Sequence, residues 1–404
     1  MKTLATLRRA ILLISLPFGI LHFALPIYGQ EIGANAVEIG LFFSAFSLMT
    51  VLLRPVVGAA LDRYGRRPFF LAGLIGYAAT MFAFALIEQV WGIVVARLFQ
   101  GAASSFLWLS ARAITADVAG EDARGRAFGG VDQASNQGAI LGTFIGFAIL
   151  LGGFEIHLSG QEISASPSST IGARWMLLFS VYGIVCLLAA LLAWRSLPET
   201  NPGTAGDPHS PSPIVWSRPW VLLLTVTAVT GASWAMLSPI LMIFLQQKLA
   251  VGIDALAWAY LPAATVWAVL PTRLGALADR FGRKPSMVLG MAVAAASSFF
   301  IPGLASLAGL AALWALQALC YAAGDPAEQA LVADLTGGDQ RGRAYGLYTL
   351  AAGLGTTVGP LMGGWLYEAI GPHAPFVANG VVLAVCAGVL WALLEAPARK
   401  AAPL

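Results

Sequence analysis

The sequence predicts an all-α membrane protein in which twelve transmembrane helices form two pseudo-symmetric six-helix bundles. Three observations support this prediction: the composition, the spacing of the apolar stretches and an internal repeat. Of the 404 residues, 58% are hydrophobic and only 11% are charged, and the mean hydropathy is +0.78. A soluble domain carries about 25% charged residues, so this chain has too few charges to cover a surface exposed to water. The composition excludes a soluble enzyme, a disordered chain and a secreted disulfide scaffold.

Twelve apolar stretches are long enough to cross the hydrocarbon layer, which takes about 20 residues in a helix. Proline, glycine and charge clusters separate them. The first stretch follows basic residues, as in a signal peptide, but it has no small-residue cleavage site, and we expect it to be retained. The predicted spans are residues 9–29, 39–61, 68–88, 90–117, 126–151, 173–197, 219–247, 255–277, 285–305, 308–333, 343–369 and 374–395.

Basic residues set the predicted orientation. Seventeen of the 23 Lys and Arg residues fall on one side of this topology, while Arg54, Arg97, Arg112 and Arg273 fall within spans. The positive-inside rule then places both termini in the cytoplasm, and an even number of spans requires the same. We expect a multi-pass protein of the cytoplasmic (cell) membrane. The net charge is only +3, and the basic residues fall in short clusters between the apolar stretches, so nucleic acid is not an expected partner.

A segment rich in proline and glycine, residues 198–218, is interpreted as a cytoplasmic linker between bundles at 1–197 and 219–404. The two bundles repeat one another at a constant offset, since GAALDRYGRRP begins at Gly58 and GALADRFGRKP begins at Gly275. The same offset relates DARGRAFG, from Asp122, to DQRGRAYG, from Asp339. Two separate segments with one offset indicate a duplicated six-helix unit.

The repeated segment resembles the loop signature G-x-x-x-D-R-x-G-R-R/K of the major facilitator superfamily, a family of secondary transporters. The signature lies between the second and third spans and again between the eighth and ninth, and the resemblance covers essentially the whole chain. It implies the major facilitator fold, with substrate bound near the membrane midplane between the halves. It also implies a gate or conformational motif made of Gly58, Asp62, Arg63, Gly65, Arg66, Arg67, Asp117, Gly275, Asp279, Arg280, Arg283 and Asp334.

The charges of this motif suit a gate on physical grounds. A carboxylate near the N-terminus of a helix is stabilised by the positive end of the helix dipole. The arginines can pair with Asp117 or Asp334, at the ends of the fourth and tenth spans, only while the helices are adjacent. Such contacts bias an equilibrium between two conformations. The alternative is that these residues only fix the topology.

The fourth span carries Arg97, Gln100 and Gly101 in a pattern that resembles the superfamily's R-x-x-Q-G motif. An arginine inside a span costs about 2.5–3.5 kcal/mol on insertion scales and normally faces a cavity or a partner. The resemblance implies a part in proton transfer or in recognition of substrate charge. Trp314 occupies the position one repeat later, so this arginine belongs to the first half alone. The alternative is a side chain that snorkels to the outer interface.

The fifth span combines a polar stripe with glycines at every fourth position. The glycines permit close packing of helices. Within the superfamily the chain is most like the drug:proton antiporter subgroup, which has a glycine–proline motif in this span. Thr143 stands where that proline is expected, whereas the second half keeps Pro360. The stripe and the glycines are Asp132, Gln133, Asn136, Gln137, Gly138, Gly142 and Gly146.

Ionisable groups inside spans are the candidates for coupling transport to protons. Carboxyl groups in apolar surroundings take up protons more readily than carboxyl groups in water, and histidine titrates near neutral pH. Pro326 is expected to kink the tenth span beside its two acids. The alternative readings are ion pairs of the acids with Arg54, Arg112 or Arg273, and a histidine that only packs. The candidates are Asp132, Asp325, Glu328, Arg97 and His22.

Aromatic and amide side chains within spans are candidates for a mixed apolar and polar substrate cavity. Trp and Tyr near helix ends are more often interface anchors, so only part of the aromatic set is retained. The cavity candidates are Gln100, Trp108, Arg112, Asn136, Trp234, Gln246 and Tyr321.

The expected function is secondary active export of a small amphipathic molecule by alternating access, in exchange for protons. Protons are preferred to sodium because ionisable groups lie in spans and no broken-helix sodium site is visible. One alternative is proton-coupled uptake of a sugar or other metabolite, and a more remote one is a membrane sensor that does not transport. An enzyme is not expected, because His22, His157, His209 and His373 are scattered. The expected partners are a small molecule, protons and lipid; neither cofactor nor metal is expected, and the chain is expected to act as a monomer.

Overall fold

A computed structural model describes residues 2–119, 124–150, 167–200, 216–270, 282–335 and 341–394. The chain divides into two compact units, Met1–Gly206 (unit 1) and Asp207–Leu404 (unit 2). The helices described in unit 1 are α1 (Lys2–Glu31), α2 (Ala36–Tyr64), α3 (Arg67–Leu86), α4 (Val90–Val118), α5 (Arg124–Leu150) and α6 (Pro167–Ser196).

Unit 2 is also helical, and its described residues form more elements than those of unit 1. Its described helices are α7 (Arg218–Leu237), α8 (Leu241–Leu249), α9 (Ile253–Val269), α11 (Arg283–Phe300), the short 3-10 helix η2 (Ile301–Gly303), α12 (Leu307–Leu335), α13 (Arg341–Ala369) and α14 (Ala374–Leu393). When α7 and α8 are taken as one broken helix, the described residues form twelve long helical passes, and the predicted all-α architecture is confirmed.

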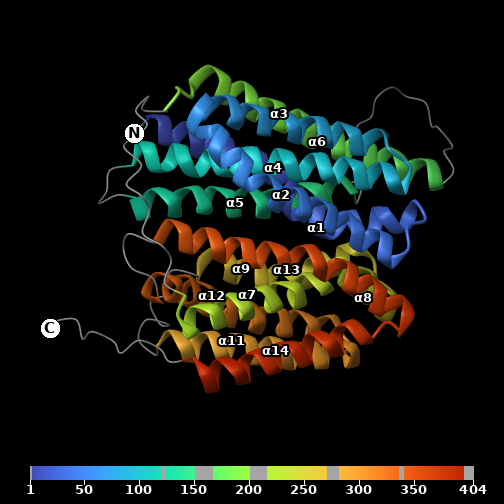
Figure 1. Cartoon of the computed structure of the whole chain (residues 1–404). Helices are drawn as coiled ribbons and strands as arrows, with labels where there is room; N and C mark the ends of the chain where they lie inside the picture. The colour runs from blue at the N-terminus through green and yellow to red at the C-terminus, as the bar shows by residue number, and fades with distance from the viewer. Residues whose placement is uncertain are drawn as a thin grey trace. The chain divides into compact units, whose positions relative to one another are not determined.

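Helix pairing is the same in the two units. In unit 1, α1 packs against α5, α2 against α4 and α3 against α6. In unit 2, α7 packs against α13, α9 against α12 and α11 against α14. Within each unit the helices run lengthwise beside one another (Figure 1). The duplication read from two loop segments therefore extends to the packing of the helices.

Glycines explain how closely α1 approaches α5, and α7 approaches α13. A Cβ atom added at Gly142 of α5 would overlap the carbonyl oxygen of Leu16 in α1. A Cβ atom added at Gly359 of α13 would overlap the carbonyl oxygen of Ala232 in α7 in the same way. Because these two glycines are separated by the same offset as Gly58 and Gly275, both units use the close packing of small residues that membrane helices favour.

A second matched contact joins the third and sixth helices of each unit. A Cβ atom at Gly183 of α6 would stand 2.8 Å from the ring of Phe82 in α3, and a Cβ atom at Gly380 of α14 would stand 2.7 Å from the ring of Phe299 in α11. The two phenylalanines keep the offset of the repeat, whereas the two glycines are closer together in the sequence. Unit 1 therefore has a longer chain between its third and sixth helices, and this extra length has left the packing unchanged.

A polar network ties together three helices of unit 2. Ser233 of α7 donates to the side-chain carbonyl oxygen of Asn379 in α14 (2.6 Å), and the Asn379 amide donates to the Ser298 hydroxyl of α11 (2.6 Å). Asn379 is 1% exposed. A buried amide is costly to leave without hydrogen-bond partners, and here both of its ends are bonded.

The structure differs from the sequence prediction in the seventh span. A continuous helix was predicted at 219–247, but α7 ends at Leu237 and α8 begins at Leu241. Pro239 has no backbone N–H and removes a hydrogen bond from the helix, and the Ile240 N–H donates to the carbonyl of Leu237 (3.2 Å), only three residues back. The seventh span is therefore interrupted rather than continuous. By contrast, α12 continues as helix past Pro326.

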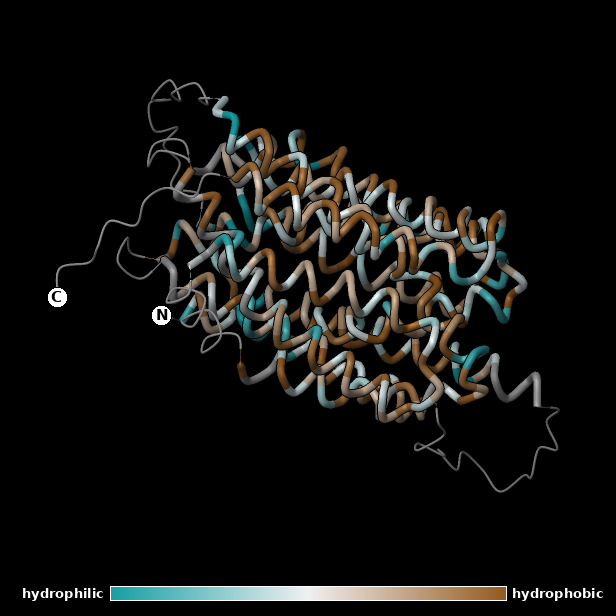
Figure 2. The backbone as a smooth tube through the Cα atoms, turned by 90° about the horizontal axis from the view of Figure 1, so that it is seen from below, coloured by the Kyte–Doolittle hydropathy of each residue, from teal (hydrophilic) through white to brown (hydrophobic). Residues whose placement is uncertain are grey.

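Eight helical segments of the described chain are long and apolar enough to cross a membrane by themselves: α1, α2, α3, α4, α6, α7 with α8, α11 and α14. Hydrophobic colour runs along most of the helical tubes (Figure 2). The remaining passes are α5, α9, α12 and α13. Of these, α5 and α13 are the two glycine-rich helices that pack on α1 and α7. Their assignment as membrane spans therefore rests more on the internal repeat and on helix packing than on hydropathy.

Candidate functional site

The junction of α2 and α3 contains the first copy of the repeated motif. Gly65 ends α2 with φ = 95°, a backbone conformation that glycine adopts without strain. Pro68 then stands in the first turn of α3, where its missing N–H costs nothing. Gly282, the equivalent residue of unit 2, has φ = 100°. The glycine of the motif is therefore required by the turn itself.

Arg66 forms the ion pair that the sequence predicts. Its Nε lies 3.3 Å from Oδ2 of Asp117, near the end of α4, and its Nη1 donates to the carbonyl oxygen of Leu61 (2.7 Å). Thr200, which follows α6, donates from Oγ1 to the same Asp117 oxygen (3.1 Å). These contacts join the α2–α3 junction, α4 and the segment after α6 within one unit.

Glu199 completes this arrangement and was missed by the sequence analysis. Its carboxylate accepts hydrogen bonds from the backbone N–H groups of Arg66 (2.9 Å) and Arg67 (3.1 Å), at the start of α3. A Cβ atom at Gly65 would lie 2.6 Å from Oε2 of Glu199, so the glycine also makes room for the carboxylate. We call Arg66, Asp117, Glu199 and Thr200 the α2–α3 latch.

The side chain of the last basic residue of the motif is not part of the α2–α3 latch. Arg67 donates from Nη2 to the carbonyl oxygen of Trp194 near the end of α6 (2.6 Å), and Lys284, its equivalent in unit 2, donates to the carbonyl oxygen of Leu394 after α14 (2.8 Å). Cations favour the C-terminal ends of helices. Arg67 was expected in the gate; in the structure it anchors α3 to the end of α6.

Other residues of the motif are less informative. Arg63 is exposed and lies over the Tyr64 ring (5.3 Å). No described atom of its unit lies within 4 Å of a Cβ atom placed at Gly58. The side chain of Asp62 lies outside the description. In the second copy the same holds for the side chains of Arg283 and Asp334, and for the whole of Gly275, Asp279 and Arg280.

Arg97 lies inside unit 1, and its side chain does not extend to the outer membrane–water interface. It is 6% exposed; its Nε donates to the carbonyl oxygen of Phe42 (2.9 Å), and its Nη1 donates to Oε1 of Gln100 (2.5 Å). The guanidinium carbon lies 4.4 Å from the ring centroid of Phe46 and 5.3 Å from that of Phe43. The snorkelling alternative is therefore wrong, and Gln100, a predicted cavity residue, is instead a buried partner of Arg97.

His22 of α1 lies beside this group. Its ring packs edge-on against Phe43, with centroids 6.0 Å apart, and its Nδ1 is 3.2 Å from the carbonyl oxygen of Phe18. The side chain is exposed, as are those of Asp132 and Asn136 on α5 and Arg112 on α4. These polar groups lie on sides of their helices that the described chain leaves uncovered.

Glu328 is the candidate acid that the structure describes most fully. Its Oε1 accepts a hydrogen bond from Thr227 of α7 (2.8 Å), and the phenol of Tyr348 in α13 also donates to it. No described Lys or Arg of unit 2 forms an ion pair with it. Of the predicted arginine partners, Arg273 lies outside the described residues and Arg54 and Arg112 belong to unit 1, so that alternative stays a prediction. The carboxyl group of α12 therefore contacts α7 and α13 at once. The side chain of Asp325 lies outside the description.

The remaining cavity candidates are partly brought together. Trp234 of α7 and Tyr321 of α12 meet edge-to-face with centroids 4.7 Å apart, and Trp234 is 51% exposed. Trp108 lies in unit 1, with its ring 6.1 Å from that of Phe18. Gln246 is half-buried on α8. The structure thus distributes these residues over both units.

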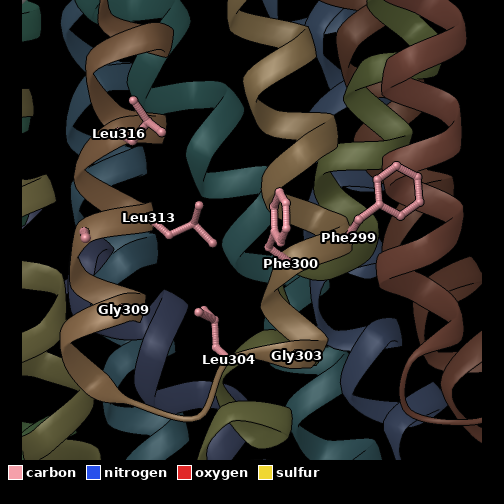
Figure 3. Close-up of a pocket in the computed structure, with 8 residues that line it drawn as sticks. Phe299, Phe300, Gly303, Leu304, Gly309, Leu313 and Leu316 are labelled. Carbon is pink, nitrogen blue, oxygen red and sulfur yellow. The ribbon is translucent and has the colours of Figure 1, made fainter.

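An apolar hollow of about 440 Å³ lies at the turn between α11 and α12. Its wall includes Phe300 on one side and Leu313 on the other, with Leu304 at the end near the turn (Figure 3). Every lining side chain is apolar. Since a binding site needs a few polar groups to orient its ligand, this hollow is not the transport site.

The helices and contacts described above define the class of the protein. Two matched six-helix units built on a duplicated sequence are the architecture of a secondary transporter. The chain belongs to the Major Facilitator Superfamily, whose family model matches residues 10–274 and 223–404. It is therefore a multi-pass membrane transporter of small molecules and not an enzyme.

Relatives of known name cover most of the chain. Multidrug resistance protein 1 of Bacillus subtilis is 22% identical over 392 residues, which are 95% of this chain and 94% of the relative. Tetracycline resistance protein, class G, of Vibrio anguillarum is 27% identical over 350 residues, covering 82% and 80%. The human Chromaffin granule amine transporter is 27% identical over 370 residues; the match spans 90% of this chain and 66% of that transporter, just under two thirds.

Solved structures share the fold. The human organic anion transporter MFSD10 matches with a TM-score of 0.65 at 20% identity, over 96% of this chain and 99% of that one. A bacterial homolog of the human lysosomal transporter Spinster matches with a TM-score of 0.77 at 16% identity, over 96% and 95%. At these identities the similarity concerns the fold alone.

Proposed function

We propose that this superfamily member exports a small amphipathic molecule by alternating access, in exchange for protons. The observation that carries the proposal is the position of Glu328: a carboxyl group within α12, bonded by the hydroxyl groups of Thr227 and Tyr348. No described cation of its unit fixes it in the charged form. A carboxyl group held only by neutral donors can exchange a proton without breaking an ion pair.

The contacts of Glu328 connect its proton to two neighbouring helices of unit 2. It contacts α7 and α13, the helix pair whose glycines bring them into close contact in unit 2. A protonated carboxyl group donates one hydrogen bond, whereas a carboxylate only accepts. Protonation therefore changes how α12 is held against α7 and α13, which is what coupling requires.

Export is supported by the names of two relatives, a multidrug and a tetracycline resistance protein. Aromatic groups such as the Trp234–Tyr321 pair suit an amphipathic substrate better than a sugar. We further propose that the α2–α3 latch lies on the cytoplasmic side with both termini, because the basic residues gather there. The latch would stabilise one of the two conformations of the transport cycle.

The test uses the purified full chain in proteoliposomes with an imposed pH gradient. Three probes share a naphthalene ring and differ in charge: 1-naphthoate, 1-naphthamide and 1-naphthylmethylamine; xylose represents the uptake alternative. The proposal predicts that the gradient drives accumulation of a naphthalene probe and that Glu328→Gln abolishes this. Glu368→Gln, which removes an exposed carboxyl group of α13, is the matched control and is expected to transport normally.

Three results would count against the proposal. Transport by Glu328→Gln at the wild-type rate would exclude Glu328 as the proton site, and Asp132→Asn and Asp325→Asn would then be examined in the same assay. Transport that follows a sodium gradient and ignores pH would exclude proton coupling. Gradient-driven movement of xylose alone would favour the uptake alternative.

A further inference from the structure

Thr227 directs its hydroxyl group toward another helix, unlike the other two threonines of α7. A threonine inside a helix commonly bonds to the carbonyl oxygen four residues earlier, as Thr225 (2.9 Å) and Thr230 (2.8 Å) do. Thr227 is 4% exposed and donates instead to Oε1 of Glu328 in α12 (2.8 Å). Its hydroxyl group therefore serves the carboxyl group and not its own helix.

Unit 1 contains the same junction of helices without a polar group. There α4 contacts α1 and α5, as α12 contacts α7 and α13 in unit 2. The residues one repeat before Thr227, Glu328 and Tyr348 are Ala10, Ala111 and Val131. They are 0%, 0% and 3% exposed. Since apolar side chains fill this junction in unit 1, packing alone does not account for the acid and its two hydroxyl partners in unit 2.

The two hydroxyl groups can bond to Glu328 in both of its protonation states. A carboxylate only accepts hydrogen bonds, whereas a protonated carboxyl group also donates one, and a hydroxyl group can do either. Hydrogen bonds to the charged form of an acid are the stronger ones and favour that form. Thr227 and Tyr348 therefore stabilise the carboxylate more than the carboxylic acid.

Tyr348 is the titratable group that faces Glu328 from the helices packed on α12, as far as these are described. The side chain of Asp325, on α12 itself, lies outside the description. Other described ionisable groups of these helices have different partners or lie exposed near helix ends: Arg218 of α7, Tyr260 of α9, Lys284 of α11, and Tyr367 and Glu368 of α13. The two hydroxyl groups are thus the polar contacts through which the described chain acts on the carboxyl group.

We propose that Thr227 and Tyr348 are positioning residues that set the pH at which Glu328 releases its proton. They hold the carboxyl group between α7 and α13, and they favour the carboxylate over the carboxylic acid. This inference deepens the proposed function, and it rests on that function for the statement that the proton drives transport.

Titration of Glu328 itself tests the proposal. Infrared spectra of the purified full chain in detergent, recorded over a range of pH, contain the C=O band of each protonated carboxyl group, and the part that is missing in Glu328→Gln belongs to Glu328. Thr227→Val and Tyr348→Phe each remove one hydroxyl group and keep nearly the same shape. Each is expected to move the midpoint of the Glu328 band upward by about one pH unit, because the carboxylate loses a donor.

Matched controls remove a hydroxyl group from the same two helices. Thr230→Val removes one that bonds to backbone carbonyl oxygens of α7, and Tyr367→Phe removes one that donates to Gln247 of α8 (3.1 Å). Both should keep the wild-type midpoint. Thr227→Ser keeps a donor and should return the midpoint close to that of the wild type. Thr227→Ala, with the residue that unit 1 has at this place, covers the case in which Thr227→Val does not fold.

The midpoints also separate the two proposals. The inference is overturned if folded Thr227→Val and Tyr348→Phe keep the wild-type midpoint, if they lower it, or if the controls raise it equally. A Glu328 band that does not titrate overturns it as well. The infrared titration involves neither a membrane nor a pH gradient. Unshifted midpoints with gradient-driven transport intact would therefore refute this inference alone, whereas shifted midpoints without such transport would refute the proposed function alone.

Discussion

Glu199 is predicted to hold the start of α3 in place, and the variant Glu199→Ala tests this role. The carboxylate accepts the N–H groups of Arg66 and Arg67, two of the donors that a helix leaves unbonded at its N-terminus. It comes from a residue 133 positions away in the chain from Arg66. Its removal thus affects the junction of α2 and α3 without changing any residue of the motif.

The magnitude follows from the kind of bond that is lost. Loss of a side-chain cap at a helix N-terminus costs about 0.5–2 kcal/mol, and an anion is further favoured there by the helix dipole. Glu199 is exposed and Thr200 still binds Asp117, so we expect about 1–2 kcal/mol. This corresponds to amide hydrogen exchange about 5–30 times faster at residues 66–70, provided exchange occurs by local opening.

Hydrogen exchange read by mass spectrometry on the full chain in detergent is the assay. The matched control is Glu38→Ala, because Oε2 of Glu38 accepts the Asn35 N–H (2.9 Å) at the start of α2 in the same manner. Each variant is expected to speed exchange at its own helix start and leave the other unchanged. If Glu199→Ala leaves the exchange of residues 66–70 at the wild-type rate, the proposed positioning role is refuted.

The other predictions concern packing, the buried network and the ion pair. Gly142→Ala places a methyl group against the Leu16 carbonyl oxygen, so it is expected to cost about 1–3 kcal/mol of stability and to lower the melting temperature of the purified protein. The control is Gly129→Ala on the same helix, whose methyl group meets no described atom within 4 Å and should stabilise the protein by up to about 1 kcal/mol. Equal effects of the two substitutions would contradict the packing account. Asn379→Ala removes the acceptor of Ser233 and should lower the free energy of unfolding by about 1–3 kcal/mol. Thr225→Ala, on the exposed side of α7, is the control and should change it little. An unchanged melting temperature for Asn379→Ala would show that the network is dispensable. A double-mutant cycle with Arg66→Ala and Asp117→Ala should give a coupling energy of about 0.5–1 kcal/mol that falls at high salt, and additivity would show that the ion pair adds nothing.

The features that could be predicted from the sequence are those that local residue patterns encode. The constant offset between the two copies of the motif anticipated matching helix pairs, and the glycines of the fifth span were correctly linked to close packing, because one small residue every fourth position already describes a helix face. The pair of Arg66 with Asp117 could be expected, since both residues lie at helix ends on the same side of the predicted topology.

Contacts that depend on distant backbone could not be read in this way. Glu199 looks like an ordinary exposed acid in Pro-Glu-Thr, and only the folded chain brings it to the backbone of Arg66. The neutral surroundings of Arg97 depend on a carbonyl group and two rings from α2, which no spacing reveals. The break after Leu237 depends on one proline whose effect varies with its neighbours, as the unbroken helix at Pro360 shows.

Proton release on ligand binding tests the central claim most directly. The purified chain, in weakly buffered detergent with a pH indicator, is mixed with whichever of the three naphthalene probes stabilises it most. The account predicts that binding releases protons from the wild type and from Glu368→Gln, and that Glu328→Gln binds the probe without releasing them. Binding to the wild type without proton release, or undiminished release from Glu328→Gln, would contradict it.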